Sequence, residues 1–198
     1  MTSTIEQTVT LGVAVQSDQL IELLEGTSTH ADSKASPYDK LGAVKIVGEG
    51  GKITATATDK YRLIEGEIEG EGELTASLIP LADIKRILSL VKPNKLPRSV
   101  SLSRVGDILT VSVAGDAVSI TLLEGTYPDT DKLLDYSTPP VALESISFNP
   151  KLFADYAKIA GKDKPVRVEF TGDRKPIRVF FTGNKVAWKA LLMPMRTI

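Results

Sequence analysis

Residues 75–91 read TASLIPLADIKRILSLV, a short apolar run that passes directly into a helical pattern. Thr75 to Ile79 has the composition of a strand, and the face of the following helix carries Leu81, Ile84, Leu88 and Val91. Pro80 suits the start of a helix because it has no backbone N–H to leave unpaired, and Pro93 stops the pattern. This stretch therefore predicts a strand followed at once by an amphipathic helix.

The same order of strand, helix and further strands occurs in three places along the chain. After the helix just described, strands are expected at Val100–Leu102, Ile108–Val113 and Val118–Leu123, with turns at Gly106-Asp107 and Gly115-Asp116. Upstream, a strand at Val13–Val15 precedes a helix from Ser17 to Gly26 and strands at Ala43–Val47 and Ile53–Thr58. Downstream, Ser145–Phe148 precedes a helix at Pro150–Ala160, capped by Gly161, and strands at Val166–Phe170, Ile177–Phe181 and Val186–Leu192.

Repetition of this unit predicts an α+β fold in which helices cover one face of mainly antiparallel sheets. A linker at Asp135–Val141, which contains Pro139-Pro140, separates the third unit from the first two. We therefore expect a complete two-unit domain at residues 1–140 and a half domain at residues 141–198. The third unit has no partner unit in the chain, so we expect its apolar residues to be exposed: Phe148, Leu152, Phe153, Tyr156 and Val168.

Composition limits the classes of function. Lys+Arg 24 against Asp+Glu 25 leaves a net charge of −1, so the whole molecule is not a polycation drawn to DNA or anionic lipid. The absence of cysteine excludes disulfides, thiol catalysis and cysteine-ligated zinc, and it fits a reducing compartment. No apolar stretch reaches the ~18 residues of a membrane helix, and Met1 to Thr10 does not resemble a signal peptide. A cytoplasmic location is expected.

The residues offer little support for enzyme chemistry, and we expect neither catalysis nor a cofactor. The single histidine, His30, lies in a polar, turn-rich segment without a predictable catalytic partner, so we expect it at the surface. Four aspartates fall at turns, where backbone geometry favours them, rather than converging on a metal: Asp59, Asp107, Asp116 and Asp129. The glycines of residues 48–52 predict a hairpin turn, because a phosphate loop needs a Lys-Ser/Thr ending and a helix. Trp188 is assigned to the core.

Three short segments are distinctive: residues 57–63 (ATDKYRL), residues 123–129 (LEGTYPD) and residues 192–196 (LMPMR). Together they resemble one known family, the bacterial DNA polymerase III beta subunit, or sliding clamp. Residues 57–63 (ATDKYRL) resemble its Ala-Thr-Asp-Gly-His-Arg-Leu strand end, residues 123–129 (LEGTYPD) its Asp-Gly-Xaa-Phe-Pro-Asp turn, and residues 192–196 (LMPMR) its carboxyl-terminal Met-Pro-Met-Arg-Leu. The segments occur in the family's order, with Phe148-Asn149-Pro150 before the last helix. Residues 8–135 resemble the family's middle domain and residues 141–198 the second half of its last domain.

The resemblance implies a DNA clamp-like fold and a processivity factor that encircles duplex DNA without sequence preference. It also implies a hydrophobic pocket for short peptides of the polymerase and the clamp loader, formed by Thr58, Tyr61, Arg62, Leu63, Pro80, Ile84, Met193, Pro194, Met195 and Arg196. Methionine adapts to varied ligands and proline makes a rigid wall, which suits such a pocket. The alternative is that Leu63, Ile84 and Met193 fill the core. The sequence departs from the family at Lys60-Tyr61, where the family has Gly-His, and at Thr197-Ile198.

Helices that line a hole for DNA should present basic faces. Two helices meet this condition, with candidate DNA-facing residues Lys85, Arg86, Lys92, Lys151, Lys158 and Lys162. An ordinary solvated helix face would look the same. The first helix instead carries an acidic stripe of Asp18, Glu22 and Glu25, so either it lies away from DNA or the lining is weakly basic.

Assembly follows from the number of units. Rings of the family contain twelve units and this chain supplies three, so four chains would complete a ring, and we expect a homo-oligomer of tetrameric form. In the alternative, the third unit folds back on the first domain and gives a monomer. Three functions remain open at this point: a processivity ring, a non-encircling module that binds clamp-interacting peptides, and a metal-dependent nuclease.

Overall fold

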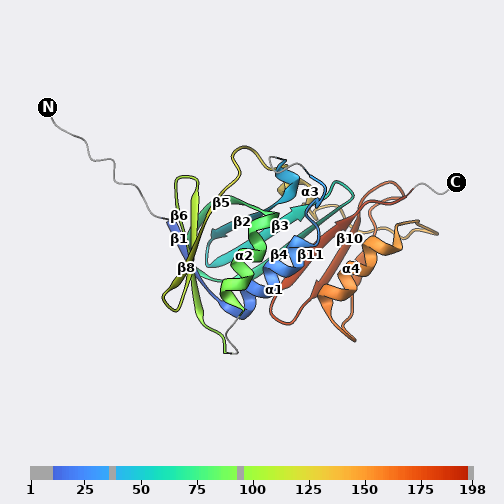
Figure 1. Cartoon of the computed structure of the whole chain (residues 1–198). Helices are drawn as coiled ribbons and strands as arrows, with labels where there is room; N and C mark the ends of the chain where they lie inside the picture. Colours follow the sequence, from blue (N-terminus) through green and yellow to red (C-terminus); the bar gives the residue numbers. More distant parts are fainter. Residues whose placement is uncertain (1–10, 36–38, 93–95, 196–198) are drawn as a thin grey trace.

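The computed structural model describes residues 11–35, 39–92 and 96–195, which form one sheet covered by helices on one face (Figure 1). The strands are β1 (Leu11–Gln16), β2 (Ala43–Glu49), β3 (Lys52–Thr58), β4 (Arg62–Glu69), β5 (Glu71–Pro80), β6 (Ser99–Val105), β7 (Ile108–Val113), β8 (Asp116–Thr121), β9 (Arg167–Glu169), β10 (Ile177–Thr182) and β11 (Ala187–Leu192). The helices are α1 (Ser17–Ser28), the 3-10 turn η1 (Lys40–Gly42), α2 (Leu81–Val91), α3 (Thr130–Leu133) and α4 (Pro150–Ala160). The expected α+β class is confirmed.

The strands of all three units join in a single sheet. Its order is β8-β7-β6-β1-β5-β2-β3-β4-β11-β10-β9, and every pair of neighbours is antiparallel. The junction between the first and third units is the β4–β11 ladder, which runs from Glu67↔Ala187 to Arg62↔Leu192. The third unit therefore extends the sheet of the first unit within the same chain.

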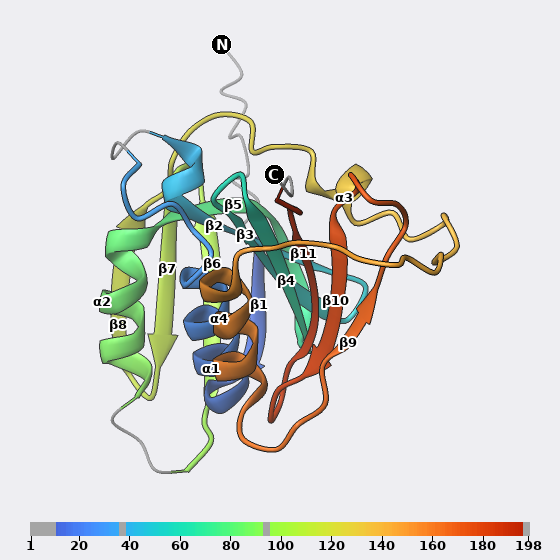
Figure 2. The same cartoon turned by 90° about the vertical axis from the view of Figure 1, so that its right-hand side faces the viewer.

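The core lies between this sheet and the layer of α1, α2 and α4, which stand side by side on one face (Figure 1). Figure 2 shows the same layer from the side of α4. Each helix turns its apolar face toward the sheet, and several residues predicted for that face are half-buried rather than buried. In α1 the buried residues include Leu20, Leu23 and Leu24, in α2 they are Ile84, Ile87 and Val91, and in α4 they are Tyr156 and Ala160. No helix within the described residues is long and apolar enough to span a membrane.

Trp188 anchors the third unit on the first. Its side chain is 2% exposed, which confirms its assignment to the core. Its indole ring fills a slot beside Gly26 of α1 and Gly66 of β4, where a Cβ on either glycine would collide with the ring. Because the ring comes from β11 and the glycines from the first unit, the contact between the units is closely packed.

The structure corrects several expectations about the third unit. Tyr156 is fully buried, and Phe148, Leu152, Phe153 and Val168 are half-buried against the core, so the expected exposed patch is wrong. The reason is that the third unit packs on the first. Ser145–Phe148 is not a strand but forms one bridge, between Ser147 and Met195.

The first helix also differs from its prediction. It continues past Gly26 to Ser28, so Gly26 does not end the helix. The missing side chain of Gly26 instead leaves room for the ring of Trp188. Ser17 is not a side-chain N-cap, since its hydroxyl accepts the amide of Arg98 instead.

A long connection after β8 leads from the second unit to the third. At its start, Tyr127 packs against Ala43 and Leu78, whose side chains point away from the helix layer. Farther along, the guanidinium of Arg178 donates to the carbonyl oxygen of Thr138 at 2.7 Å, and Tyr136 packs on the ring of Phe180. These contacts fasten the connection to the sheet.

Candidate functional site

Several residues of the predicted pocket lie close together at one end of the inner strands of the sheet. Pro80 pairs with Ala43 across β5 and β2, and Thr58 pairs with Leu63 across β3 and β4. Leu63 in turn pairs with Leu191 of β11. The ends of these strands therefore lie in one row. The neighbouring turns and α2 extend from the same ends of the strands.

The carboxyl-terminal segment lies next to the β3–β4 turn. The backbone N–H of Met193 donates to the carbonyl oxygen of Tyr61 at 2.8 Å. Tyr61 is 66% exposed, Met193 43% and Met195 56%, so all three present apolar surface to solvent. We call this group the apolar patch.

The other predicted pocket residues divide by burial. Leu63 and Ile84 lie in the core, so for these two the core-filling alternative fits the structure. Thr58 is buried, and its hydroxyl donates to the carbonyl oxygen of Arg62 at 2.7 Å, which holds the turn. Pro80 is half-buried at the start of α2, and Arg196 lies outside the described residues.

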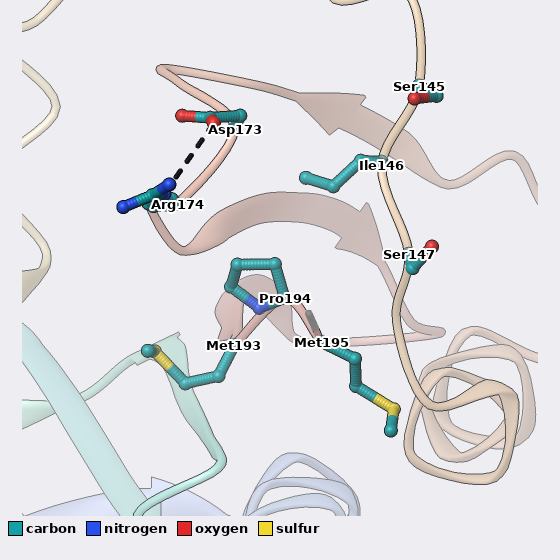
Figure 3. Close-up of a pocket in the computed structure, with 8 residues that line it drawn as sticks. All are labelled: Ser145, Ile146, Ser147, Asp173, Arg174, Met193, Pro194 and Met195. Carbon is teal, nitrogen blue, oxygen red and sulfur yellow. Dashed lines mark ion pairs between the residues drawn. The ribbon is translucent and has the colours of Figure 1, made fainter. Parts of the chain in front are cut away.

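A pocket of about 700 Å³ opens beside the apolar patch (Figure 3). It is lined by Ser145, Ile146, Ser147, Asp173, Arg174, Met193, Pro194 and Met195. Ile146 and Pro194 face its interior, while the side chains of Met193 and Met195 leave the terminal segment toward different sides. Three separate chain segments thus line a pocket that carries both apolar and polar side chains.

Arg62 serves as a cross-link beside this site. Its guanidinium donates to Asp59 at 2.9 Å, to Asp155 of α4 at 2.5 Å and to the carbonyl oxygen of Thr29 at 2.8 Å. Partial burial works to raise the pKa of Asp155, but hydrogen bonds from Lys158 and Arg62 outweigh it and hold that pKa below its usual range. The network joins the β3–β4 turn, the end of α1 and α4.

His30 lies beneath this network and is fully buried, so its expected surface position is wrong. Its ring stacks on that of Tyr156 at 5.2 Å between centroids, and the hydroxyl of Thr29 lies 2.8 Å from Nδ1. Burial, followed by the nearby charge of Arg62, lowers the pKa of His30 to about 3. The prediction failed because the ring is covered by Tyr156 of α4, a residue far away in the sequence that the local polar composition does not reveal.

The predicted DNA-facing residues lie on the helix layer, but half of them are paired. Arg86 pairs with Asp83 at 2.6 Å, Lys92 with Glu25 at 2.5 Å, and Lys158 with Asp155 at 2.7 Å. Within the residues that the structure describes, no ion pair joins Lys85, Lys151 or Lys162 to a carboxylate.

The acidic stripe of α1 has structural partners. Glu22 accepts the backbone N–H groups of Asn184 and Lys185 at 2.7 and 2.9 Å, and Asp18 lies 3.6 Å from the ammonium of Lys185. With Glu25 on Lys92, the stripe holds α1 to the β10–β11 turn and to the end of α2. Because α1 lies between α2 and α4 (Figure 1), its charges offset much of their basic character.

Comparison with known proteins agrees with the motifs. No protein-family model matches the chain. The beta sliding clamp of Micrococcus luteus is 27% identical over 146 residues, which cover 72% of this chain and 47% of that protein, so the chain spans about half of the relative's length.

Solved structures of sliding clamps superpose on most of the chain. The DNA polymerase III beta subunit of Thermotoga maritima matches with a TM-score of 0.80 at 15% identity, covering 100% of this chain and 68% of that one. The sliding clamp of Pseudomonas aeruginosa matches with a TM-score of 0.79 at 15% identity, covering 94% and 67%. The resemblance inferred from the three motifs is confirmed: the chain is similar to bacterial beta sliding clamps and has their fold.

Proposed function

We propose that the chain is a non-catalytic, cytoplasmic sliding-clamp processivity factor. It encircles duplex DNA as a homo-oligomer and tethers the polymerase, the clamp loader and other partners through short peptides. The observation that carries this proposal is the exposed apolar patch beside a pocket, at one end of the inner strands, in a chain with the fold of sliding clamps.

The peptide site rests on the chemistry of that region. Two methionines and a tyrosine stay exposed although the chain has a well-filled core, and such surface is usually reserved for a partner. Pro194 cannot donate a ladder hydrogen bond, so the segment ends the sheet instead of extending it. Unbranched methionine side chains can then adapt to apolar anchors of different shapes.

DNA contact rests on the lysines of the helix layer that carry no ion pair among the described residues. Lys85, Lys151 and Lys162 are exposed on α2 and at the two ends of α4. Loose contacts from lysines to phosphates carry no sequence information and weaken with salt, as sliding requires. The acidic side chains of α1, which lies between the two basic helices, weaken this attraction. The closed shape of the ring, rather than its affinity, therefore has to keep it on DNA.

Retention on circular DNA tests the ring. A closed ring loaded on nicked circular plasmid should co-elute with it in gel filtration and leave when the plasmid is linearised. Lys85→Glu with Lys151→Glu should lower loading or retention, whereas Lys132→Glu, on α3, should not. Release from circular and linear DNA at the same rate would contradict encirclement.

A second candidate is a non-encircling module that binds clamp-interacting peptides. The observation in its favour is that the third unit is already docked on the first through Trp188 and the β4–β11 ladder, so the chain buries this unit without a neighbour. Such a module would bind the same peptides and show no difference between circular and linear DNA.

A further inference from the structure

Two exposed positive side chains lie beside the apolar patch. Lys60 is at the tip of the β3–β4 turn and is exposed, directly before Tyr61. Arg174 lies in the β9–β10 turn and lines the pocket together with Met193, Pro194 and Met195, and its side chain is 94% exposed. One cation thus comes from the first unit and one from the third, and both are next to residues of the patch.

The neighbouring carboxylates leave these two charges largely uncompensated. Asp59 and Asp155 are both engaged by Arg62, and Asp155 also by Lys158. Asp173 approaches Arg174 only to 3.8 Å with a side chain that is itself exposed, and Lys175 follows in the same turn. Among the described residues, no carboxylate pairs with Lys60.

The backbone presents Lys60 in a defined place. Its φ of 77° lies in the left-handed region, which suits glycine better than lysine. The turn is kept in this shape because Oδ1 of Asp59 accepts the N–H groups of Tyr61 and Arg62, each at 3.0 Å. A position whose geometry favours glycine therefore carries a cation beside the patch.

We infer that the peptide bound at this pocket carries acidic residues next to its apolar anchors, with Lys60 and Arg174 as the residues that set this preference. The inference rests on the proposed peptide-binding function and adds the charge of the partner. The anchors occupy the patch and the pocket, and the flanking carboxylates lie near the two cations. Complementary charge favours such a partner, and like charge disfavours a basic one.

Three synthetic peptides with the same leucine and phenylalanine anchors test this preference on the full chain. Their flanks are acidic (Asp, Glu), uncharged (Ser, Gln) or basic (Lys), and fluorescence polarisation measures each Kd. At low salt the acidic peptide should bind about 3- to 10-fold more tightly than the uncharged one, as expected for two exposed charge pairs. The difference should shrink at about 0.5 M salt.

The double variant Lys60→Gly, Arg174→Ser should bring the affinity of the acidic peptide to that of the uncharged one. Lys60→Gly also removes the left-handed lysine, so the turn should fold at least as well. Lys185→Ser, in the turn at the opposite end of β11, removes a charge from the same molecule and should keep the preference. A preference that survives the double variant, or that Lys185→Ser also abolishes, would overturn the role of Lys60 and Arg174.

The test separates this inference from the proposed function. If acidic and uncharged peptides bind the wild-type chain equally well, and a peptide with alanine anchors does not, the charge preference is wrong and the peptide site stands. If no anchored peptide binds better than the alanine peptide, the peptide site itself is wrong, and the inference falls with it.

Discussion

Met193 and Met195 differ from most apolar residues of the chain because their side chains remain about half exposed beside an open pocket. Leu63 and Ile84 come from the same motif-matched set, yet they are buried and contribute to stability first. The candidate residues therefore form two groups. The exposed residues can contact a partner, whereas the buried residues support the site from the core.

Replacing both methionines by alanine should weaken binding of an anchored peptide by ~1 to 3 kcal/mol in total, because the partner's apolar side chains lose their contact surface. Calorimetry gives the affinity, and circular dichroism should show an unchanged fold and melting temperature. Met193→Leu with Met195→Leu, which keeps the apolar volume, is the matched control. An unchanged affinity in the alanine variant would remove these residues from the site.

His30 connects one buried ring to the pH dependence of the whole fold. Its pKa in the folded chain is about 3, whereas an exposed histidine titrates near 6.5. Between these values the unfolded chain binds a proton that the folded chain does not. The titration of His30 therefore costs the folded chain no stability above about pH 6.5. As the pH falls below this value, the free energy of unfolding declines by up to ~1.4 kcal/mol per pH unit.

We expect the urea midpoint of the wild-type chain to fall steadily from pH 6.5 to pH 5. The chain has no other histidine, so no second imidazole contributes in this range. His30→Phe keeps an aromatic ring against Tyr156 and should flatten the slope over the same range. Equal slopes for the two proteins would show that His30 is not buried as a neutral ring.

Among the elements, the contact between β11, β4 and α1 decides how the third unit is held. Trp188 fits only because Gly26 and Gly66 carry no side chain. Arg62 adds polar contacts at the same junction by joining the β3–β4 turn to α4 through Asp155. The acidic stripe of α1 then fastens the β10–β11 turn, through Glu22.

Gly66→Ala should destabilise the chain by ~1 to 3 kcal/mol, because the added Cβ would collide with the rings of Trp188 and with Leu23. Urea denaturation followed by the fluorescence of Trp188, the single tryptophan, measures the effect at this junction. Glu67→Ala, at the next position of β4, should cost less than ~1 kcal/mol, since its pair with Lys52 is largely exposed. Equal effects of the two changes would contradict the packing described here.

For the whole molecule, the two outer strands of the sheet define how copies of the chain could meet. Among the described residues, β8 and β9 each have a strand neighbour on one side only. A ring could close by placing β8 of one copy beside β9 of the next, which is a head-to-tail contact. The docked third unit removes the exposed patch that would have favoured a two-fold contact between third units.

We predict from the count of units that light scattering will give four times the chain mass of 21.3 kDa at micromolar concentration. The reason is that the resemblance to sliding clamps implies a ring of twelve units, which four chains of three units would supply. Dilution should shift the mass toward smaller species if the edges form the contact. A monomer that does not change with concentration would exclude the tetrameric ring and favour the non-encircling module.

Most of the local structure and the similarity to sliding clamps could be predicted from the amino-acid sequence alone. Hydrophobic period and the positions of proline and glycine predicted α2, α4 and most strands, because these signals act within a few residues. The order of three short motifs was enough to identify the sliding-clamp resemblance, although His30 and Ser145–Phe148 were misplaced where polar or apolar composition was judged without its packing partners.

The exposure of the matched residues and the position of the third unit could not be predicted in this way, because both depend on contacts between distant parts of the chain. Leu63 and Met193 are both apolar residues of the motifs, and their difference in exposure depends on contacts between β4, β11 and α4. The β4–β11 ladder joins residues more than a hundred positions apart, and the space for Trp188 comes from glycines in two other elements. Such contacts depend on shape and chain topology, so no local pattern of residues encodes them.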